Sequence, residues 1–105
     1  MPFKVTISPR AQVEIEGAIT FYAERSTEAP TAFIIALDKA FQSLAISPYF
    51  AIKYKQIRSI PLQNFPFALF FTINQISNTV EIRACFITNE IHKEGQESEL
   101  NSFIP

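Results

Sequence analysis

The sequence predicts an α+β fold, a small and mainly antiparallel β-sheet with an N-terminal strand and an α-helical hairpin packed on one face. Two long stretches in the first half of the chain carry apolar residues at helical spacing. The second half instead carries alternating or continuous apolar runs, which are typical of strands. The expected order is β-α-α-β-β-β. With 105 residues, 48% of them apolar, the chain is expected to form one domain around one core.

The first strand and the first helix meet at Ser8-Pro9. In residues 3–8, apolar and polar side chains alternate, as in a half-buried strand. Ser8 supplies a capping hydroxyl and Pro9 suits the first helical position, so a helix is expected from here to about Arg25. Its apolar stripe comprises Ala11, Ile15, Ala18, Ile19 and Tyr22. Gly17 weakens this helix but is expected to leave room for close packing.

A second helix is expected from about Pro30 to Ser47-Pro48, because the residue before a proline disfavours helical dihedrals. Its apolar stripe comprises Phe33, Leu37, Ala40, Phe41 and Leu44. The short turn that joins this helix to the first one predicts an antiparallel helical hairpin with one shared apolar face.

Three strands are expected after the hairpin. Lys53–Ile60 mixes basic and apolar residues like an edge strand, whereas Phe65–Ile73 is nearly all apolar and predicts a central strand covered on both faces. Asn74–Asn78 is the expected turn into Thr79–Thr88. Alternation places Val80, Ile82, Ala84 and Phe86 on one face of that last strand, and Glu81, Arg83, Cys85 and Ile87 on the other. Residues 89–105 are expected to be a polar, acidic tail with little core-forming power, in which a short amphipathic helix near Glu97–Phe103 is one alternative.

The formal net charge of −1 disfavours a protein that coats nucleic acid through its overall charge. The charge is nevertheless uneven, with a basic middle and an acidic end. A single Cys cannot form an internal disulfide, which favours a reducing, cytoplasmic location. The start of the chain does not read as a signal peptide, and the longest apolar stretch is too short to cross a bilayer, so no membrane association is expected.

Several short motifs are similar to those of a known family. They are Ser8-Pro9-Arg10-Ala11, Phe21-Tyr22, Phe41 and Leu44 before Ser47-Pro48, the stretch from Arg58 to Phe67 with Phe70-Phe71, and Val80–Phe86. Over residues 3–88 the chain resembles the small toxins of the ParE/RelE superfamily from bacterial type II toxin–antitoxin operons, in particular the ParE-like branch. The resemblance implies a cytoplasmic antitoxin partner whose C-terminal segment wraps the toxin. It also implies action on DNA gyrase, which is the activity of ParE members, rather than hydrolysis.

The sequence departs from the patterns of both branches. The ParE-like branch usually places a His and then an Arg after the last strand, where this chain has Ile87 and Asn89-Glu90. RelE-type messenger RNA endonucleases have an Arg at the place of Ala68, and an Arg and a Tyr near the C-terminus, where this tail has neither. These departures favour a binding protein over an enzyme, and no catalytic residue is assigned.

The candidates for binding the target or the antitoxin are the cations of the strand region. They are Lys53, Lys55, Arg58 and Arg83. Strand alternation places Lys53 and Lys55 on one face and Arg58 on the other, so one face gathers all four only with a bulge. The alternative is that they are solvated strand charges that discourage aggregation, with Arg83 simply pairing with Glu81. Arg83 stays a candidate because a groove could lie on the face opposite the helices.

Other reactive residues are interpreted structurally. His92 lies in the polar tail with nothing to fix its tautomer, and Cys85 is expected to be an ordinary buried residue. The Phe65–Phe71 run is interpreted as core rather than as a base-stacking platform. One His and one Cys give no spaced metal-ligand cluster, and the chain has no Gly-rich phosphate loop, so neither metal nor cofactor is expected.

Three hypotheses about function follow. The first is a ParE-like toxin that binds a target, with DNA gyrase the target implied by the resemblance, and is neutralised by its antitoxin. The second is a ribosome-dependent messenger RNA endonuclease of RelE type that uses Lys53, Lys55 and Arg58. The third is a degenerate, non-toxic member that still binds an antitoxin.

Overall fold

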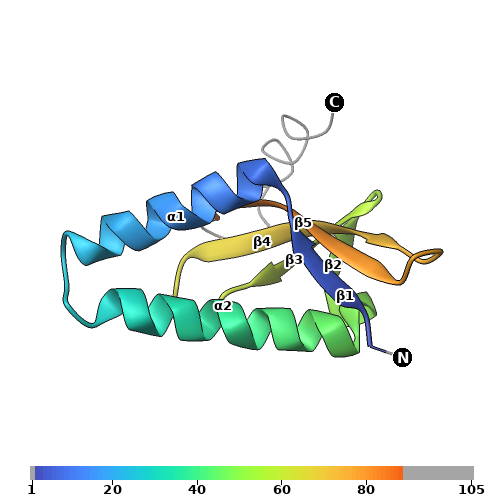
Figure 1. Cartoon of the computed structure of the whole chain (residues 1–105), viewed down its shortest axis with the longest axis horizontal. Helices are drawn as coiled ribbons and strands as arrows, with labels where there is room; N and C mark the ends of the chain where they lie inside the picture. The colour runs from blue at the N-terminus through green and yellow to red at the C-terminus, as the bar shows by residue number, and fades with distance from the viewer. Residues whose placement is uncertain (1, 89–105) are drawn as a thin grey trace.

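The computed structural model describes residues 2–88 and contains two long helices packed on one five-stranded sheet (Figure 1). The elements in chain order are β1 (Lys4–Ile7), α1 (Pro9–Ala23), α2 (Ala29–Ile46), the 3₁₀ turn η1 (Pro48–Phe50), β2 (Ile52–Tyr54), β3 (Ile57–Pro61), β4 (Phe67–Asn74) and β5 (Thr79–Ile87). The sheet order is β1-β5-β4-β3-β2, with β1 parallel to β5 and every other pair antiparallel. The predicted α+β class is confirmed. The predicted acidic tail and its short helix lie outside the described residues.

The helix boundaries follow the predicted signals. The Ser8 hydroxyl accepts a hydrogen bond from the Ala11 backbone N–H at 3.2 Å, and Pro9 stands at the start of α1. The second helix ends at Ile46, directly before Ser47-Pro48. Residues next to each boundary in the chain therefore determine where α1 begins and where α2 ends.

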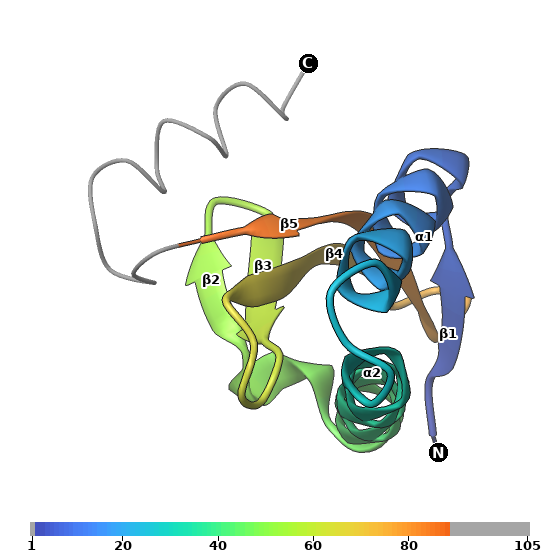
Figure 2. The same cartoon turned by 90° about the vertical axis from the view of Figure 1, so that its left-hand side faces the viewer.

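The helical hairpin packs on one side of the sheet (Figure 2). The main core lies between them, and residues of both predicted apolar stripes belong to it. Its fully buried large side chains include Phe33, Leu44, Leu69, Phe71, Val80 and Ile82. By length and composition α2 is apolar enough to cross a membrane. Because Phe33, Leu37 and Leu44 are buried against the sheet, we interpret α2 as the core helix of a globular domain.

Gly17 has no packing role. A Cβ built at this position meets no atom within 4 Å beyond its chain neighbours and the adjacent backbone of α1, and the residue is exposed. The expectation that Gly17 allows close packing is therefore wrong.

The segment predicted as one edge strand, Lys53–Ile60, folds as the β2–β3 hairpin. The chain reverses at Lys55, whose φ of 57° lies in the left-handed region. Lys53 therefore pairs directly with Arg58 across the hairpin, and directly opposed residues project to the same face. The predicted separation of Lys53 and Arg58 onto opposite faces is wrong.

The central position of β4 is confirmed, and apolar residues cover both its faces. A second, smaller cluster lies on the face away from the helices, which we call the open face. It comprises Tyr54, Ile57, Ala68, Phe70, Ala84 and Phe86. The rings of Phe70 and Phe86 stack with centroids 4.4 Å apart.

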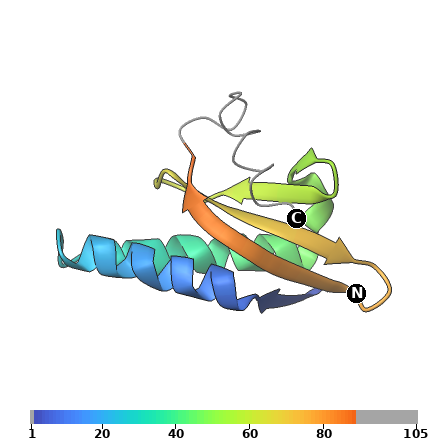
Figure 3. The ribbon, with the colours of Figure 1, turned by 90° about the horizontal axis from the view of Figure 1, so that it is seen from above.

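The predicted turn between β4 and β5 is also confirmed (Figure 3). The Asn74 side-chain oxygen accepts hydrogen bonds from the backbone N–H groups of Ile76 and Ser77, at 3.0 and 3.1 Å. Asn78 adopts a φ of 56°, which asparagine tolerates better than most residues.

A β-bulge at Arg83 changes the predicted faces of β5. Phe70 pairs with Ala84, but the next residue, Phe71, pairs with Ile82, so Arg83 is the extra residue. Before the bulge Val80 and Ile82 face the helices; after it Cys85 does, and Ala84 joins the cluster on the open face together with Phe86. The predicted common face for Val80, Ile82, Ala84 and Phe86 is wrong, because strict alternation stops at the bulge.

Candidate binding surfaces

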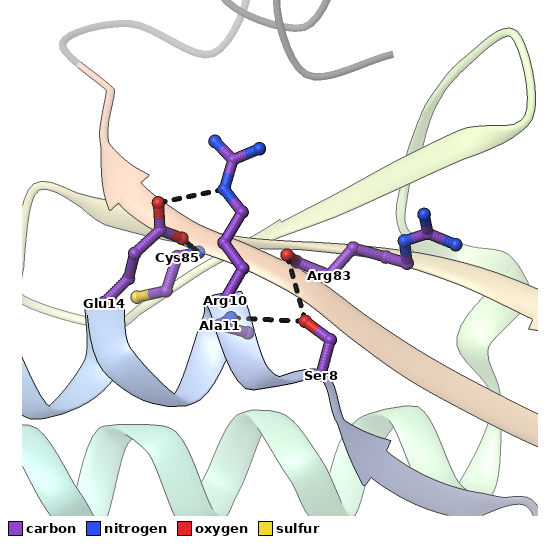
Figure 4. A network of polar contacts seen from close by, with 6 residues as sticks. All are labelled: Ser8, Arg10, Ala11, Glu14, Arg83 and Cys85. Atoms are coloured by element: carbon purple, nitrogen blue, oxygen red, sulfur yellow. Dashed lines mark hydrogen bonds and ion pairs between the residues drawn. The ribbon is translucent and has the colours of Figure 1, made fainter. Parts of the chain in front are cut away.

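The first turns of α1 hold the bulged part of β5 (Figure 4). The Ser8 hydroxyl donates a hydrogen bond to the Arg83 carbonyl at 3.2 Å while it caps α1. The Glu14 carboxylate accepts a hydrogen bond from the Cys85 backbone N–H at 2.8 Å and forms an ion pair with Arg10 at 3.1 Å. A bulge disrupts the strand ladder, and these side chains satisfy one backbone group of the bulged residue and one backbone group two residues after it.

The sequence interpretation missed these contacts of Ser8 and Glu14 with β5. One signal was available for Glu14. It stands three residues after Ala11 and directly before Ile15, at the border of the buried stripe, where a carboxylate can reach the neighbouring sheet. The bulge that supplies its backbone partner left no sequence signal.

Arg83 lines a polar groove on the open face. Its guanidinium contacts the Glu81 carboxylate at 3.5 Å, and both side chains are partly exposed. The groove has a volume of about 690 Å³, and its polar lining comprises Thr6, Thr72, Asn74, Gln75, Ser77, Thr79, Glu81 and Arg83. The open face therefore has a groove beside Arg83. The alternative interpretation, that Arg83 pairs with Glu81, also agrees with the structure.

Lys53 and Arg58 form a second basic site at the β2 edge of the sheet. The Arg58 guanidinium donates to the carbonyls of Tyr49 and Ala51, at 3.2 and 3.4 Å, and lies 5.4 Å from the centre of the Tyr49 ring. Lys53 is exposed beside it as its cross-strand partner. Lys55 stands in the β2–β3 turn, with its ammonium 5.4 Å from the centre of the Tyr54 ring.

The four predicted cations are thus not one patch. Lys53 on β2 and Arg58 on β3 lie on the same face of the sheet. This is the face on which Ile60 packs against the main core. Arg83 lies on the open face of β5, with β4 between it and β3. The cations therefore belong to two separate candidate binding surfaces.

Cys85 is buried, as predicted. Burial, and after it the negative charge of Glu14, raises the pKa of the Cys85 thiol from 9.0 to about 12. The thiol is therefore protonated at neutral pH and is a poor nucleophile. Within residues 2–88 no group of three or more His, Cys, Asp or Glu side chains could hold a metal ion. His92 lies outside that range.

No protein-family model and no curated protein sequence matches the chain. Solved structures do match. The chromosomal ParDE toxin–antitoxin system from P. aeruginosa is 11% identical, with a TM-score of 0.69, and the match covers 82% of this chain and 96% of that one. The chain has the ParE/RelE fold.

The RelBE2 toxin–antitoxin complex from Mycobacterium tuberculosis is 15% identical, with a TM-score of 0.56, and the match covers 84% of this chain and 100% of that one. A mutant of the E. coli toxin RelE in the free state is 14% identical, with a TM-score of 0.64 and full coverage of both chains. The predicted resemblance to the ParE/RelE superfamily is confirmed at the level of the fold.

Two of the positions at which the sequence departs from the ParE and RelE patterns lie in β4 and β5. Ala68 lies in the apolar cluster on the open face, where it is almost fully buried beside Phe70. Ile87 is the last residue of β5, is half exposed, and pairs with Phe67. The centre of the open face is therefore apolar at the place where a RelE-type endonuclease would carry an arginine. Asn89 and Glu90 lie outside the described residues.

Proposed function

We propose that the chain is the toxin of a type II toxin–antitoxin system and that a cognate antitoxin neutralises it in the cytoplasm. The observation that carries this proposal is the ParE/RelE fold, matched over 82 to 100% of the chain by the three toxin structures. Two of these structures are toxin–antitoxin systems, which supports an antitoxin as the partner.

We further propose that this toxin acts by binding its target, with DNA gyrase as the first target to test. The open face supports binding over RNA cleavage, because an apolar cluster fills its centre and Arg83 contacts Glu81. An RNA endonuclease needs groups that move protons as well as a cation that stabilises the phosphate. The ParE-like resemblance of the sequence supports the same choice.

Expression in a bacterial host tests this function. The chain alone is expected to stop growth, and co-expression with the small protein encoded next to it is expected to restore growth and give a complex. Purified chain is expected to inhibit DNA supercoiling by gyrase and to leave ribosome-bound messenger RNA intact. Unimpaired growth with the chain alone, together with no complex, would rule out the toxin.

One observation favours the endonuclease as a second candidate. The β2–β3 hairpin brings Lys53 and Arg58 side by side, so two of the three residues of that hypothesis could contact one phosphate backbone. A translating extract decides between the two functions. Cleavage of ribosome-bound message that is lost in the Lys53→Ala and Arg58→Ala variants would favour the endonuclease.

The third candidate is a non-toxic module that still binds an antitoxin. Ile87, at the end of β5, supports it, because this is the position where the ParE-like branch usually carries a His. A stable complex without any growth defect would identify the chain as this kind of protein.

A further inference from the structure

An apolar groove lies beside the β2 edge of the sheet, between the C-terminal end of α2, η1 and the β2–β3 hairpin. Its volume is about 340 Å³. We call it the α2–β2 groove, and its apolar lining is Leu44, Ile46, Phe50, Ala51, Ile52, Ile60 and Pro61.

The rim of this groove exposes large apolar side chains. Phe50 is 89% exposed, Ile46 is 77% exposed and Ile52 is 48% exposed. Single exposed apolar residues are common, but three of them around one apolar depression form the kind of patch that marks an interaction site. Burying them against a partner would remove most of this apolar surface from water.

The η1 wall of the groove is held from two sides. Arg58 donates to the carbonyls of Tyr49 and Ala51, which flank Phe50 in the chain. The Tyr49 ring packs edge-on against Phe3 at 5.8 Å, and its hydroxyl accepts a hydrogen bond from the Gln75 side chain at 3.1 Å. Phe50 is therefore presented from a fixed backbone, which lowers the entropic cost of binding.

The stretch of chain that lines the groove carries charge of one sign. Residues 39–80 contain no Asp or Glu, and this stretch supplies Lys53, Lys55 and Arg58. Lys53 directly follows Ile52 on β2, which is an edge strand of the sheet. A partner segment that carries carboxylates next to its apolar residues would complement both features of the surface.

We propose that the α2–β2 groove is the docking site for an acidic, apolar segment of the antitoxin, with Phe50 and Ile52 taking its apolar side chains and Lys53 its carboxylates. This inference rests on the proposed function, since it names the surface by which the toxin is neutralised.

The test is titration calorimetry of the full chain with the purified small protein encoded next to it. Phe50→Ser and Lys53→Glu are each expected to raise Kd by about tenfold or more, as central interface residues do. Val13→Ser, on the exposed side of α1, and Lys4→Glu, on the opposite edge strand β1, are the matched controls. Both controls are expected to leave Kd within about twofold. Phe50 and Lys53 are exposed, so their variants should fold, which circular dichroism verifies.

Raising sodium chloride from about 50 to about 300 mM should weaken the unaltered complex more than the Lys53→Glu complex, because salt screens the charge attraction. A tight complex that is insensitive to both Phe50→Ser and Lys53→Glu overturns the docking site and leaves the proposed function standing. The absence of any complex with the unaltered chain overturns both. Sedimentation of the chain alone covers a second copy as the occupant: a dimer that Phe50→Ser dissociates also overturns the antitoxin assignment.

Discussion

Glu14 and Cys85 are 71 positions apart in the chain, yet the Glu14 carboxylate accepts a 2.8 Å hydrogen bond from the Cys85 backbone N–H. Cys85 follows the bulged residue Arg83 by two positions. This bond therefore joins α1 to the part of β5 where the regular ladder is interrupted. Because Arg10 pairs with the same carboxylate, the outer face of α1 helps to hold Glu14 in place.

We expect Glu14→Ala to lower the free energy of unfolding by about 1–3 kcal/mol, because it leaves the Cys85 N–H without its acceptor. Urea unfolding followed by circular dichroism measures this change. The matched control is Glu16→Ala, an exposed carboxylate on the same helix, which should change stability by less than about 0.5 kcal/mol. Equal effects of the two substitutions would mean that the Glu14–Cys85 bond contributes nothing particular to stability.

We expect Ser8→Ala to destabilise the fold by about 1–2 kcal/mol, because the hydroxyl both caps α1 and donates to the Arg83 carbonyl. Ser8→Thr keeps both hydrogen bonds and should stay within about 0.5 kcal/mol of the unaltered chain. Ser8→Asp keeps the capping acceptor, but an ionised carboxylate cannot donate a hydrogen bond to the Arg83 carbonyl. The stability of this variant should therefore lie between those of Ser8→Ala and Ser8→Thr. Thermal unfolding of the three variants measures the order. An alanine variant as stable as the threonine variant would contradict the double role.

The features that were predictable from the sequence depend on residues close together in the chain. Ser8-Pro9, Ser47-Pro48 and the Asn74–Asn78 turn each act within a few positions, and their predicted boundaries are confirmed. The apolar stripes of the two helices also follow from local spacing. These signals were enough to predict the layers and the central place of β4.

The errors arise where a distant partner or an unmarked turn decides the geometry. The bulge at Arg83 exists only in the register of β5 against β4. A bulge places every later side chain on the face opposite to the one that strict alternation predicts. The turn at Lys55 is made by a lysine with positive φ, which carries none of the usual Gly or Asn signals. That unpredicted turn is what pairs Lys53 with Arg58, so the basic site at the β2 edge could not be assembled from the sequence.

We expect Gly17→Ala to stabilise the protein by about 0.5–1 kcal/mol. Gly17 lies in the interior of α1, where alanine is intrinsically favoured, and a Cβ there meets no atom within 4 Å beyond its chain neighbours and the adjacent helix backbone. Urea unfolding measures the gain in the midpoint and in the free energy of unfolding. An unchanged or lower stability would show that this helix does not follow intrinsic propensity at Gly17.

We expect the buried Cys85 thiol to make stability fall in alkaline solution. Its pKa is raised from 9.0 to about 12, so above pH 9 the folded chain keeps a proton that the unfolded chain releases. The contribution of the thiol is thus fully present below about pH 9 and is lost as the pH rises toward 12, by up to about 1.4 kcal/mol per pH unit.

Urea unfolding between about pH 8.5 and about pH 10.5 isolates this contribution when the unaltered chain is compared with Cys85→Ala. Other titrating groups affect both proteins alike, so the difference in their free energies of unfolding reports the thiol. That difference should shift steadily against the unaltered chain as the pH rises. A difference that stays constant across the range would show that the folded chain ionises Cys85 as readily as the unfolded chain, and that the thiol is not desolvated beneath α1.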